Sequence, residues 1–195
     1  MWDKKIIAIA KLNQNMDFLA YIKKIINSSI DTLVLSRDDL SEFEYFDLAK
    51  EVLKICNSKN IQCILQNFFT QSLKLNHKFF CASLPLLRKE QRLYRYFHSL
   101  GTYVYFKEEL FEAMMYKVNY AFVGNIFEDD KVNFEFLKEI LDFSKIPLYL
   151  IGDINLQNVC EFKDLNIAGI CINEKVLIEN DLKTYIKELK KKLNE

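Results

Sequence analysis

Short apolar runs rich in β-branched and aromatic residues alternate along the whole chain with longer segments whose apolar residues recur at helical spacing. One run and its following segment take about 22 residues. The runs that predict strands are 5–12, 32–36, 62–67, 78–83, 102–106, 120–125, 147–153 and 167–173. Because a helix-like segment follows most of these runs, the pattern predicts parallel strands with helices covering their faces.

The segments between the runs predict helices at 17–29, 41–59, 88–100, 107–118 and 134–144, with a last helix at 181–193. The segment after the third run, 71–76, is short. Eight strand-and-helix units are the number that closes a barrel. The sequence therefore predicts the α/β class and a compact (β/α)8 TIM barrel. A doubly wound open sheet stays open as an alternative, because the number of strands does not by itself show closure.

Composition and charge limit the classes of protein to which the chain can belong. No Pro/Gly/Ser-rich linker divides the chain, so we expect one domain over residues 1–195. Lys and Arg total 27 and Asp and Glu total 27, so the chain has no net positive charge that would attract nucleic acid or an anionic membrane. The sequence lacks an apolar segment of about 18 residues that could span a bilayer. Its first residues lack the apolar stretch of a signal peptide, so we expect a cytoplasmic protein.

In a barrel of this kind, active sites use residues at the carboxyl ends of the strands. The polar residues at the predicted strand ends are Ser36, Arg37, Asp38, Asp39, Asn67, Ser83, Asn125, Asp153 and Asn173. Two of the four glycines, Gly124 and Gly152, also fall at strand ends, whereas Gly101 is predicted to cap a helix. The Arg37 guanidinium could hold a phosphate or carboxylate through two parallel hydrogen bonds. Its two aspartate neighbours leave a plain salt-bridge network as the alternative.

These positions carry a resemblance to a known family. Segments 32–39 (TLVLSRDD), 64–68 (ILQNF), 118–131 (VNYAFVGNIFEDDK), 146–154 (IPLYLIGDI) and 167–173 (IAGICIN) resemble landmarks of the thiamine phosphate synthase/TenI family, in order along nearly the whole chain. That family is a compact (β/α)8 barrel. Its synthases couple a pyrimidine diphosphate to a thiazole phosphate with magnesium, and its TenI branch aromatises the thiazole. The resemblance implies thiamine biosynthesis with a small-molecule thiamine precursor as partner, and leaves a homo-oligomer open.

The resemblance also implies site residues. Matched cations suggest catalytic roles for Arg37 and Lys131, and the matched strand ends suggest that Asn67, Gly124, Gly152, Asp153 and Asn173 bind a thiazole or pyrimidine phosphate at the barrel mouth.

Departures from the family pattern weaken the synthase chemistry. Where the synthase has Gln-Leu-Arg-Glu-Lys, this chain has residues 35–39, LSRDD. Phe68 replaces an aspartate expected to help hold magnesium, so Mg²⁺ is implied by the family while its expected carboxylate ligands are missing, and no metal ligand is predicted. The family's Gly-Gly pair is Gly152–Asp153 here, and a carboxylate beside that glycine opposes a phosphate.

The matches and departures leave two alternative functions. The first is a divergent enzyme of thiamine biosynthesis, either a synthase-like transferase or a thiazole tautomerase. The tautomerase needs proton transfer, for which Tyr105, Asp38 or Cys171 are candidates, each with a packing or surface role as the alternative. The second is a non-catalytic barrel that binds a small ligand after losing the metal and phosphate sites.

Overall fold

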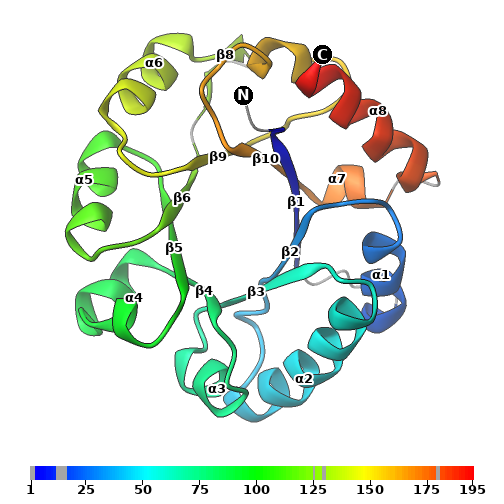
Figure 1. The fold of residues 1–195 in the computed structure, drawn as a ribbon, viewed down its shortest axis with the longest axis vertical. Coiled ribbons are helices and arrows are strands. Elements are labelled where there is room, and N and C mark those ends of the chain that lie inside the picture. The colour runs from blue at the N-terminus through cyan, green and yellow to red at the C-terminus, as the bar shows by residue number, and fades with distance from the viewer. Residues whose placement is uncertain (1–2, 12–16, 125, 129–130, 179–180) are drawn as a thin grey trace.

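Eight parallel strands close into a barrel in this computed structural model, which describes residues 3–11, 17–124, 126–128, 131–178 and 181–195, with the backbone alone for Glu128 and Lys131 (Figure 1). The strands are β1 (Lys5–Ala10), β2 (Thr32–Leu35), β3 (Gln62–Gln66), β4 (Phe79–Ala82), β5 (Ser99–Val104), β6 (Tyr120–Val123), β9 (Leu148–Ile151) and β10 (Gly169–Ile172). β1 pairs with both β2 and β10, so the predicted closed barrel is confirmed and the open sheet is excluded.

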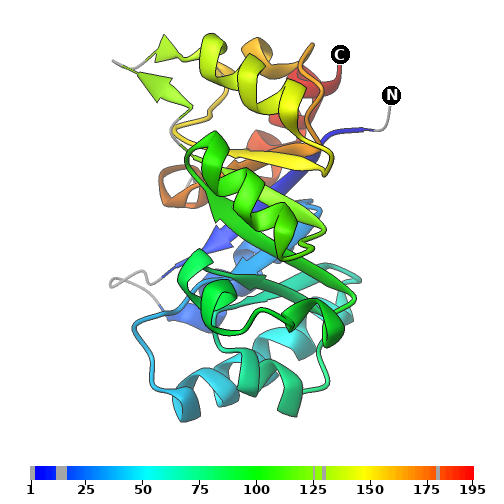
Figure 2. The ribbon, with the colours of Figure 1, turned by 90° about the vertical axis from the view of Figure 1, so that its left-hand side faces the viewer.

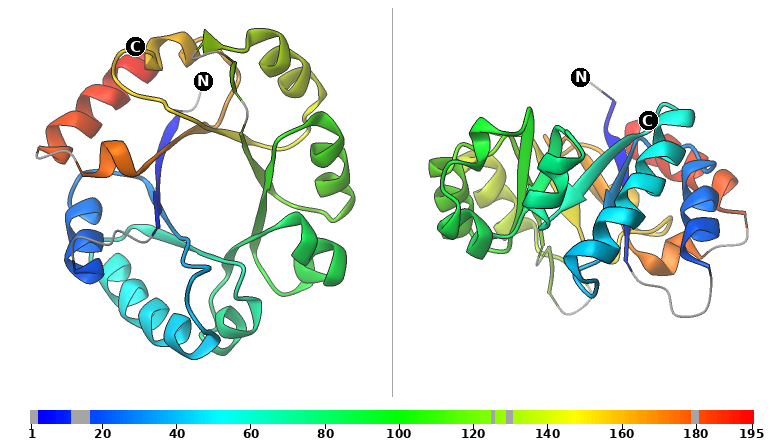
Figure 3. Two further views of the ribbon diagram at one scale, coloured as in Figure 1. Left: turned by 180° about the vertical axis from the view of Figure 1, so that it is seen from behind. Right: turned by 90° about the horizontal axis from the view of Figure 1, so that it is seen from below.

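Helices form a ring around the strands, as the view from behind shows (Figure 3). They are α1 (Phe18–Ile26), α2 (Glu42–Ser58), α3 (Phe69–Lys74), α4 (Leu84–Lys89), α5 (Lys107–Met115), α6 (Phe134–Phe143), α7 (Glu174–Leu177) and α8 (Leu182–Asn194), with 3-10 turns η1 (Leu93–Arg95) and η2 (Val159–Phe162). A small antiparallel pair, β7 (Phe127–Glu128) and β8 (Lys131–Val132), follows β6. No helix in the described ranges is long and apolar enough to cross a membrane.

Local sequence signals set where several helices begin. The Asp17 side chain accepts hydrogen bonds from the backbone N–H groups of Leu19 and Ala20, which fixes the start of α1. Ser41 and Glu44 form a reciprocal capping box at the start of α2. These caps lie at the starts of the predicted helices 17–29 and 41–59, and both predictions are confirmed.

The predicted helix 88–100 is wrong. The helix in this unit is α4, which begins earlier with Pro85 in its first turn, a position that suits proline. Residues 88–100 instead contain the end of α4, the turn η1 and the start of β5. The apolar residues at helical spacing serve separate contacts, since Phe97 stacks on Phe80 with ring centroids 4.3 Å apart.

The same shift corrects the role of Gly101. It lies within β5 rather than at a helix end, and a side chain there would overlap the ring of Tyr120 inside the barrel. A glycine at this position therefore makes room for an aromatic neighbour.

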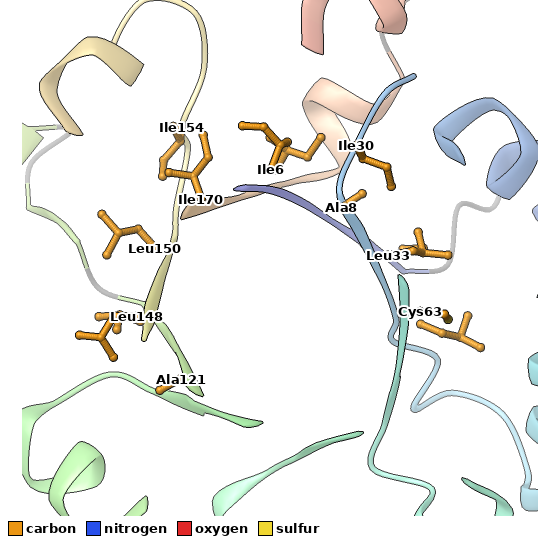
Figure 4. Close-up of a cluster of buried hydrophobic side chains, with 14 of the residues drawn as sticks. Ile6, Ala8, Ile30, Leu33, Cys63, Ala121, Leu148, Leu150, Ile154 and Ile170 are labelled. Carbon is orange, nitrogen blue, oxygen red and sulfur yellow. The ribbon is translucent and has the colours of Figure 1, made fainter. Parts of the chain in front are cut away.

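Alternate strand residues pack into two separate apolar layers. One layer fills the barrel and includes Ile7, Val34, Ile64 and Phe122. The other lies between strands and helices, and Figure 4 shows side chains such as Ile6, Leu33 and Leu150 on the outer side of the strands. Because successive strand residues point to opposite faces, each strand contributes to both layers.

The seam between β1 and β10 leaves no room for a side chain at Gly169. Gly169 pairs with Lys5 in the parallel register, and a methyl group built on it would overlap the backbone carbonyl of Lys5. Backbone in a paired strand moves less easily than the end of a side chain. Closure at this seam therefore depends on glycine.

We predict that Gly169→Ala lowers the free energy of unfolding by about 3 kcal/mol, because the added methyl group pushes apart the strands that close the barrel. Gly124→Ala is the matched control: its methyl group would meet the ring of Tyr105, which is 46% exposed and can swing away, so the loss should be about 1 kcal/mol or less. Urea denaturation measures both. Equal losses would contradict a special constraint at the seam.

Candidate functional site

The carboxyl ends of all eight strands meet at one mouth of the barrel, on the left-hand side of Figure 2 together with β7, β8 and α7. An open pocket of about 500 Å³ lies there. Its lining residues are Ile9, Lys11, Ser36, Asp38, Asp39, Gln66, Tyr103, Tyr105, Ile151 and Glu174. A smaller pocket of about 270 Å³ adjoins it, shares Lys11 and Glu174, and adds Asn173 and Lys175.

Arg37 lies at the mouth but outside the lining of this pocket. Val34 faces the barrel interior and Ser36 lines the pocket, whereas the Arg37 guanidinium lies over the ring of Phe18 at 4.6 Å. Its Nε and Nη2 atoms each donate a 2.8 Å hydrogen bond to the Asp39 carboxylate. The guanidinium is therefore already held by a carboxylate in the geometry that a phosphate would require. Its predicted catalytic role stays a prediction.

This ion pair is unequal in its exposure to solvent. The Arg37 side chain is 8% exposed and that of Asp39 is 41% exposed. The hydrogen bonds from Arg37 lower the pKa of Asp39. The buried member of the pair is thus the cation, and Asp39 is the charge that allows it to stay buried.

Asp38 joins the ends of β2 and β3 through side-chain amides. Its carboxylate accepts hydrogen bonds from Asn67 Nδ2 at 2.9 Å and Gln66 Nε2 at 3.2 Å. Asn67 adopts a positive φ of 61°, a conformation that asparagine tolerates, and its Oδ1 accepts from the backbone N–H of Ser83. Asn67 therefore links three strand ends, which places it at the predicted site.

Tyr103 fixes the orientation of the Gln66 amide. Its phenol donates a 2.7 Å hydrogen bond to Gln66 Oε1, which leaves the amide nitrogen facing Asp38. Burial raises the pKa of Tyr103 well above its ordinary value, so the phenol stays protonated as a donor. Each group in this network thus donates a hydrogen bond to the next: the phenol donates to the amide, and the amide donates to the carboxylate.

Gly152 and Asp153 follow β9, as predicted, but neither is free for a ligand. The ring of Phe127 occupies the space beside Gly152, where an added methyl group would come within 2.5 Å of Phe127 Cε2. The Asp153 carboxylate accepts 2.6 Å hydrogen bonds from Lys175 Nζ and Asn173 Nδ2. The hydrogen bond from Lys175 is the main reason that the pKa of Asp153 is lowered.

Asn173 also serves the backbone of α7. Its Oδ1 accepts from the backbone N–H groups of Lys175 and Val176, which caps this short helix. Asn173, Asp153 and Lys175 are therefore joined in one polar group on the β9–β10 side of the mouth. The sequence predicted that Asp153 and Asn173 would lie at the mouth.

The remaining predicted residues lie near β6. Gly124 follows β6, and the ring of Tyr105 covers it. The backbone of Lys131 belongs to β8, and its side chain lies outside the described part of the structure, as does all of Asn125. The structure therefore brings Asn67, Gly124, Gly152, Asp153 and Asn173 to one mouth and leaves the reach of Lys131 undescribed.

Sequence reasoning missed several lining residues. Gln66 could have been found as a polar side chain that ends an apolar strand, and Tyr103 as the residue two positions before Tyr105 on the same face. Glu174 and Lys175 lie in α7, which has four residues and is too short to produce a periodic pattern. Cys171, a candidate acid or base, lies inside the barrel, where burial raises the pKa of its thiol and disfavours the thiolate.

The donor atoms that the described residues place at the mouth do not fit the magnesium that the family resemblance implies. Both oxygens of Asp39 bind Arg37, and both oxygens of Asp38 accept from amides. Phe68, at the position of the expected aspartate, stacks on Tyr45 with ring centroids 4.0 Å apart. Within the described ranges no group of three or more His, Cys, Asp or Glu side chains could hold a metal ion.

A closed (β/α)8 barrel with a polar pocket at the carboxyl ends of its strands has the arrangement in which barrel enzymes hold their active sites. Residues 6–176 match the family model described as thiamine monophosphate synthase, and the chain belongs to this thiamine phosphate synthase/TenI family of thiamine biosynthesis.

Relatives match over most of their length. The chain is 25% identical to the thiamine-phosphate synthase of Fusobacterium nucleatum over 91% of this chain and 90% of that protein. It is 28% identical to the thiamine-phosphate synthase of Clostridium tetani over 94% of this chain and 99% of that protein.

Solved structures agree on the fold. Thiamine phosphate pyrophosphorylase from Pyrococcus furiosus superposes with a TM-score of 0.82 at 19% identity, covering 98% of this chain and 96% of that chain. KGPDC from Streptococcus mutans gives a TM-score of 0.71 at 5% identity, covering 98% of each chain. At these identities the structural similarity shows the (β/α)8 fold alone.

We predict that Asp39→Asn lowers the free energy of unfolding at pH 7 by about 2 kcal/mol, because it leaves the Arg37 charge buried without a counter-ion. The partial exposure of Asp39 keeps the loss below that of a fully buried pair. Since the folded-state pKa of Asp39 is lowered, its contribution is present above about pH 4 and is lost as the pH falls through the folded pKa.

Urea denaturation of both proteins between pH 7 and pH 3 measures this difference. Glu51→Gln is the control, since Glu51 pairs with Lys54 where both side chains are exposed, and its removal should leave stability unchanged within error. An Asp39→Asn protein as stable as the parent at pH 7 would contradict the role given to the pair.

Proposed function

We propose that the mouth pocket binds a pyrimidine or thiazole precursor of thiamine and that the protein is a divergent family member with little synthase turnover. Family membership supports thiamine biosynthesis as the setting. The observation that carries the divergence is the Arg37–Asp39 ion pair: the matched cation that follows strand β2 is bound by a carboxylate of its own chain.

Charge around the mouth supports the same proposal. A synthase must assist the departure of a diphosphate, which requires positive charge on the leaving group. Of the described cations near the mouth, Arg37 binds Asp39 and Lys175 binds Asp153, while Lys11 lines the pocket without an ion-pair partner among the described residues. One exposed ammonium is a weak replacement for a metal and a set of cations.

The residues that line the pocket can bind a small molecule and orient it. The pocket of about 500 Å³ lies in the size range of small-molecule sites. The Tyr103–Gln66–Asp38 network offers fixed hydrogen-bonding groups on one wall, and the Tyr105 ring offers an apolar face on another.

The second candidate, a non-catalytic barrel that binds a small ligand, is favoured by two aromatic contacts. The rings of Phe127 and Tyr105 fill the spaces beside Gly152 and Gly124, two positions that the resemblance implies bind the precursor. Turnover and binding measurements on the same sample distinguish the two candidates.

We predict a synthase rate below about 0.01 s⁻¹ with the pyrimidine diphosphate, the thiazole phosphate and added magnesium, against roughly 1 s⁻¹ or more for typical enzymes. The expected cause is the loss of free positive charge at the mouth. Single-turnover assays with a synthase from a relative as positive control measure it. A rate near 1 s⁻¹ would show that other residues have replaced the missing set.

We also predict that Asp153→Asn raises the affinity for inorganic phosphate about tenfold at low salt, because it removes a repelling carboxylate and releases the Lys175 ammonium. The gain is modest because the side chains of Asp153 and Lys175 are 59% and 78% exposed. Calorimetric titration of the parent and the variant measures it.

The same substitution in a Lys175→Gln background should give a smaller gain, since no ammonium is then released. If Asp153→Asn binds phosphate no better than the parent, crowding by Phe127 rather than charge keeps phosphate out.

A further inference from the structure

A large pocket lies at the end of the barrel opposite the mouth, on the right-hand side of Figure 2. This amino-end pocket, of about 690 Å³, lies where β9, β10 and β1 begin. The strand register places Lys5, Gly169 and Tyr149 in one row across these three strands. Ile7 and Cys171, two positions further along their strands, belong to the layer that fills the barrel, so the row faces the barrel interior at its amino end.

Apolar side chains form much of the wall of the amino-end pocket. Tyr149 lines it, and its ring packs edge-on against the ring of Tyr120 with centroids 6.0 Å apart. Other apolar lining residues are Leu141, Ile146, Pro147 and Ile167. The Tyr149 phenol has no hydrogen-bond partner among the described residues, and burial raises its pKa, so it stays protonated as a donor. The pocket can therefore pack against a ring and donate a hydrogen bond to it.

A second pocket of about 500 Å³, the lysine pocket, adjoins the amino-end pocket and shares Asp3 and Lys5 with it. Together the two pockets are lined by six lysines and three carboxylates. Two of the carboxylates, Asp31 and Glu195, already pair with lysines of α8. The lining lysines that have no ion-pair partner among the described residues are Lys4, Lys5, Lys145 and Lys187. This end of the barrel therefore carries an excess of positive charge.

Lys4 is a second, independent feature that points to an anion. It is 5% exposed and lines the lysine pocket, and its ammonium donates to the backbone carbonyl of Lys163. An ammonium has three N–H donors, and the other two have no acceptor among the described residues. Burial lowers the pKa of Lys4, and Asp164 opposes this shift only from beyond ion-pair distance. A buried cation without a counter-ion is costly, and an anion in the lysine pocket would compensate it.

We propose that the amino end of the barrel binds an aromatic ring that carries a diphosphate arm, a ligand of the size of a nucleoside diphosphate. The ring packs on Tyr149 in the amino-end pocket, and the diphosphate lies in the lysine pocket near Lys5 and Lys187. Lysines bind phosphate as point charges, whereas a planar carboxylate is better matched by the fork of an arginine. The volume of the amino-end pocket lies in the range of small-molecule sites.

Calorimetric titration of the parent protein with ADP, adenosine and inorganic pyrophosphate tests the proposal. ADP should bind with a Kd below about 1 mM at low salt and at least about fivefold more tightly than adenosine or pyrophosphate, because its two parts contact different pockets. Added salt should weaken the binding of ADP, since most of the lysines are exposed to solvent. Magnesium is left out, so that the diphosphate keeps its full charge.

Variants locate the site. Lys5→Gln and Lys187→Gln should each weaken ADP binding about threefold to fivefold, and Tyr149→Phe, which keeps the ring, about threefold. Lys11→Gln is the matched control, because it removes an ammonium without an ion-pair partner from the mouth and should change the affinity less than about twofold. Circular dichroism and melting temperature confirm that each variant is folded.

Three outcomes would overturn the proposal. ADP that binds more weakly than about 1 mM excludes a site of this class. Adenosine or pyrophosphate that binds as tightly as ADP shows that the ligand does not use both pockets. An affinity that falls as much in Lys11→Gln as in Lys5→Gln and Lys187→Gln places the ligand at the mouth. Precursor binding at the mouth is tested separately, so either proposal can fail without the other.

Discussion

Alternation along the strands is the constraint on which the mouth of this barrel depends. Each strand residue points either into the barrel or toward the helices, and closure through β1 and β10 removes any freedom to slip by one position. In β2 this alternation directs Val34 inward, and Ser36, which follows the strand, lines the pocket. Arg37 consequently contacts Phe18 of α1 and leaves the pocket to its neighbours.

The electrostatic character of the mouth follows from that arrangement. An arginine directed away from the pocket and buried needs a nearby anion, and Asp39 supplies it. Asp38, one position earlier, has no cation within ion-pair distance among the described residues and is held by the amides of Gln66 and Asn67. The two adjacent aspartates thus have different tasks: one stabilises a buried cation, and the other presents its charge to the pocket.

The sequence predicted the barrel well because apolar alternation and helical spacing recur in nearly every unit. It failed at residues 88–100, where Leu93, Phe97 and Leu100 have helical spacing although they belong to a turn, a loop and a strand. It placed Asn67, Asp153 and Asn173 at the mouth because strand ends are readable from apolar runs. It did not predict which side chain pairs with Arg37, or that Phe127 and Tyr105 cover the glycines, because those contacts depend on segments far apart in the chain.

Asp153 occupies the position of a glycine in the family pattern, and its carboxylate changes which groups at the mouth are free to bind a ligand. A glycine at residue 153 would leave the backbone after β9 open and the Lys175 ammonium free to bind an anion. Asp153 instead binds that ammonium and the Asn173 amide, and Asn173 in turn caps α7. The aspartate thereby ties β9 to the start of α7 through groups that would otherwise face a ligand. Combined with the Arg37–Asp39 pair on the other side of the mouth, it gives the barrel an internal carboxylate for each of two cations. Of the described cations at the mouth, Lys11 alone lacks a carboxylate partner, and a mouth with most of its positive charge already paired attracts a phosphate weakly.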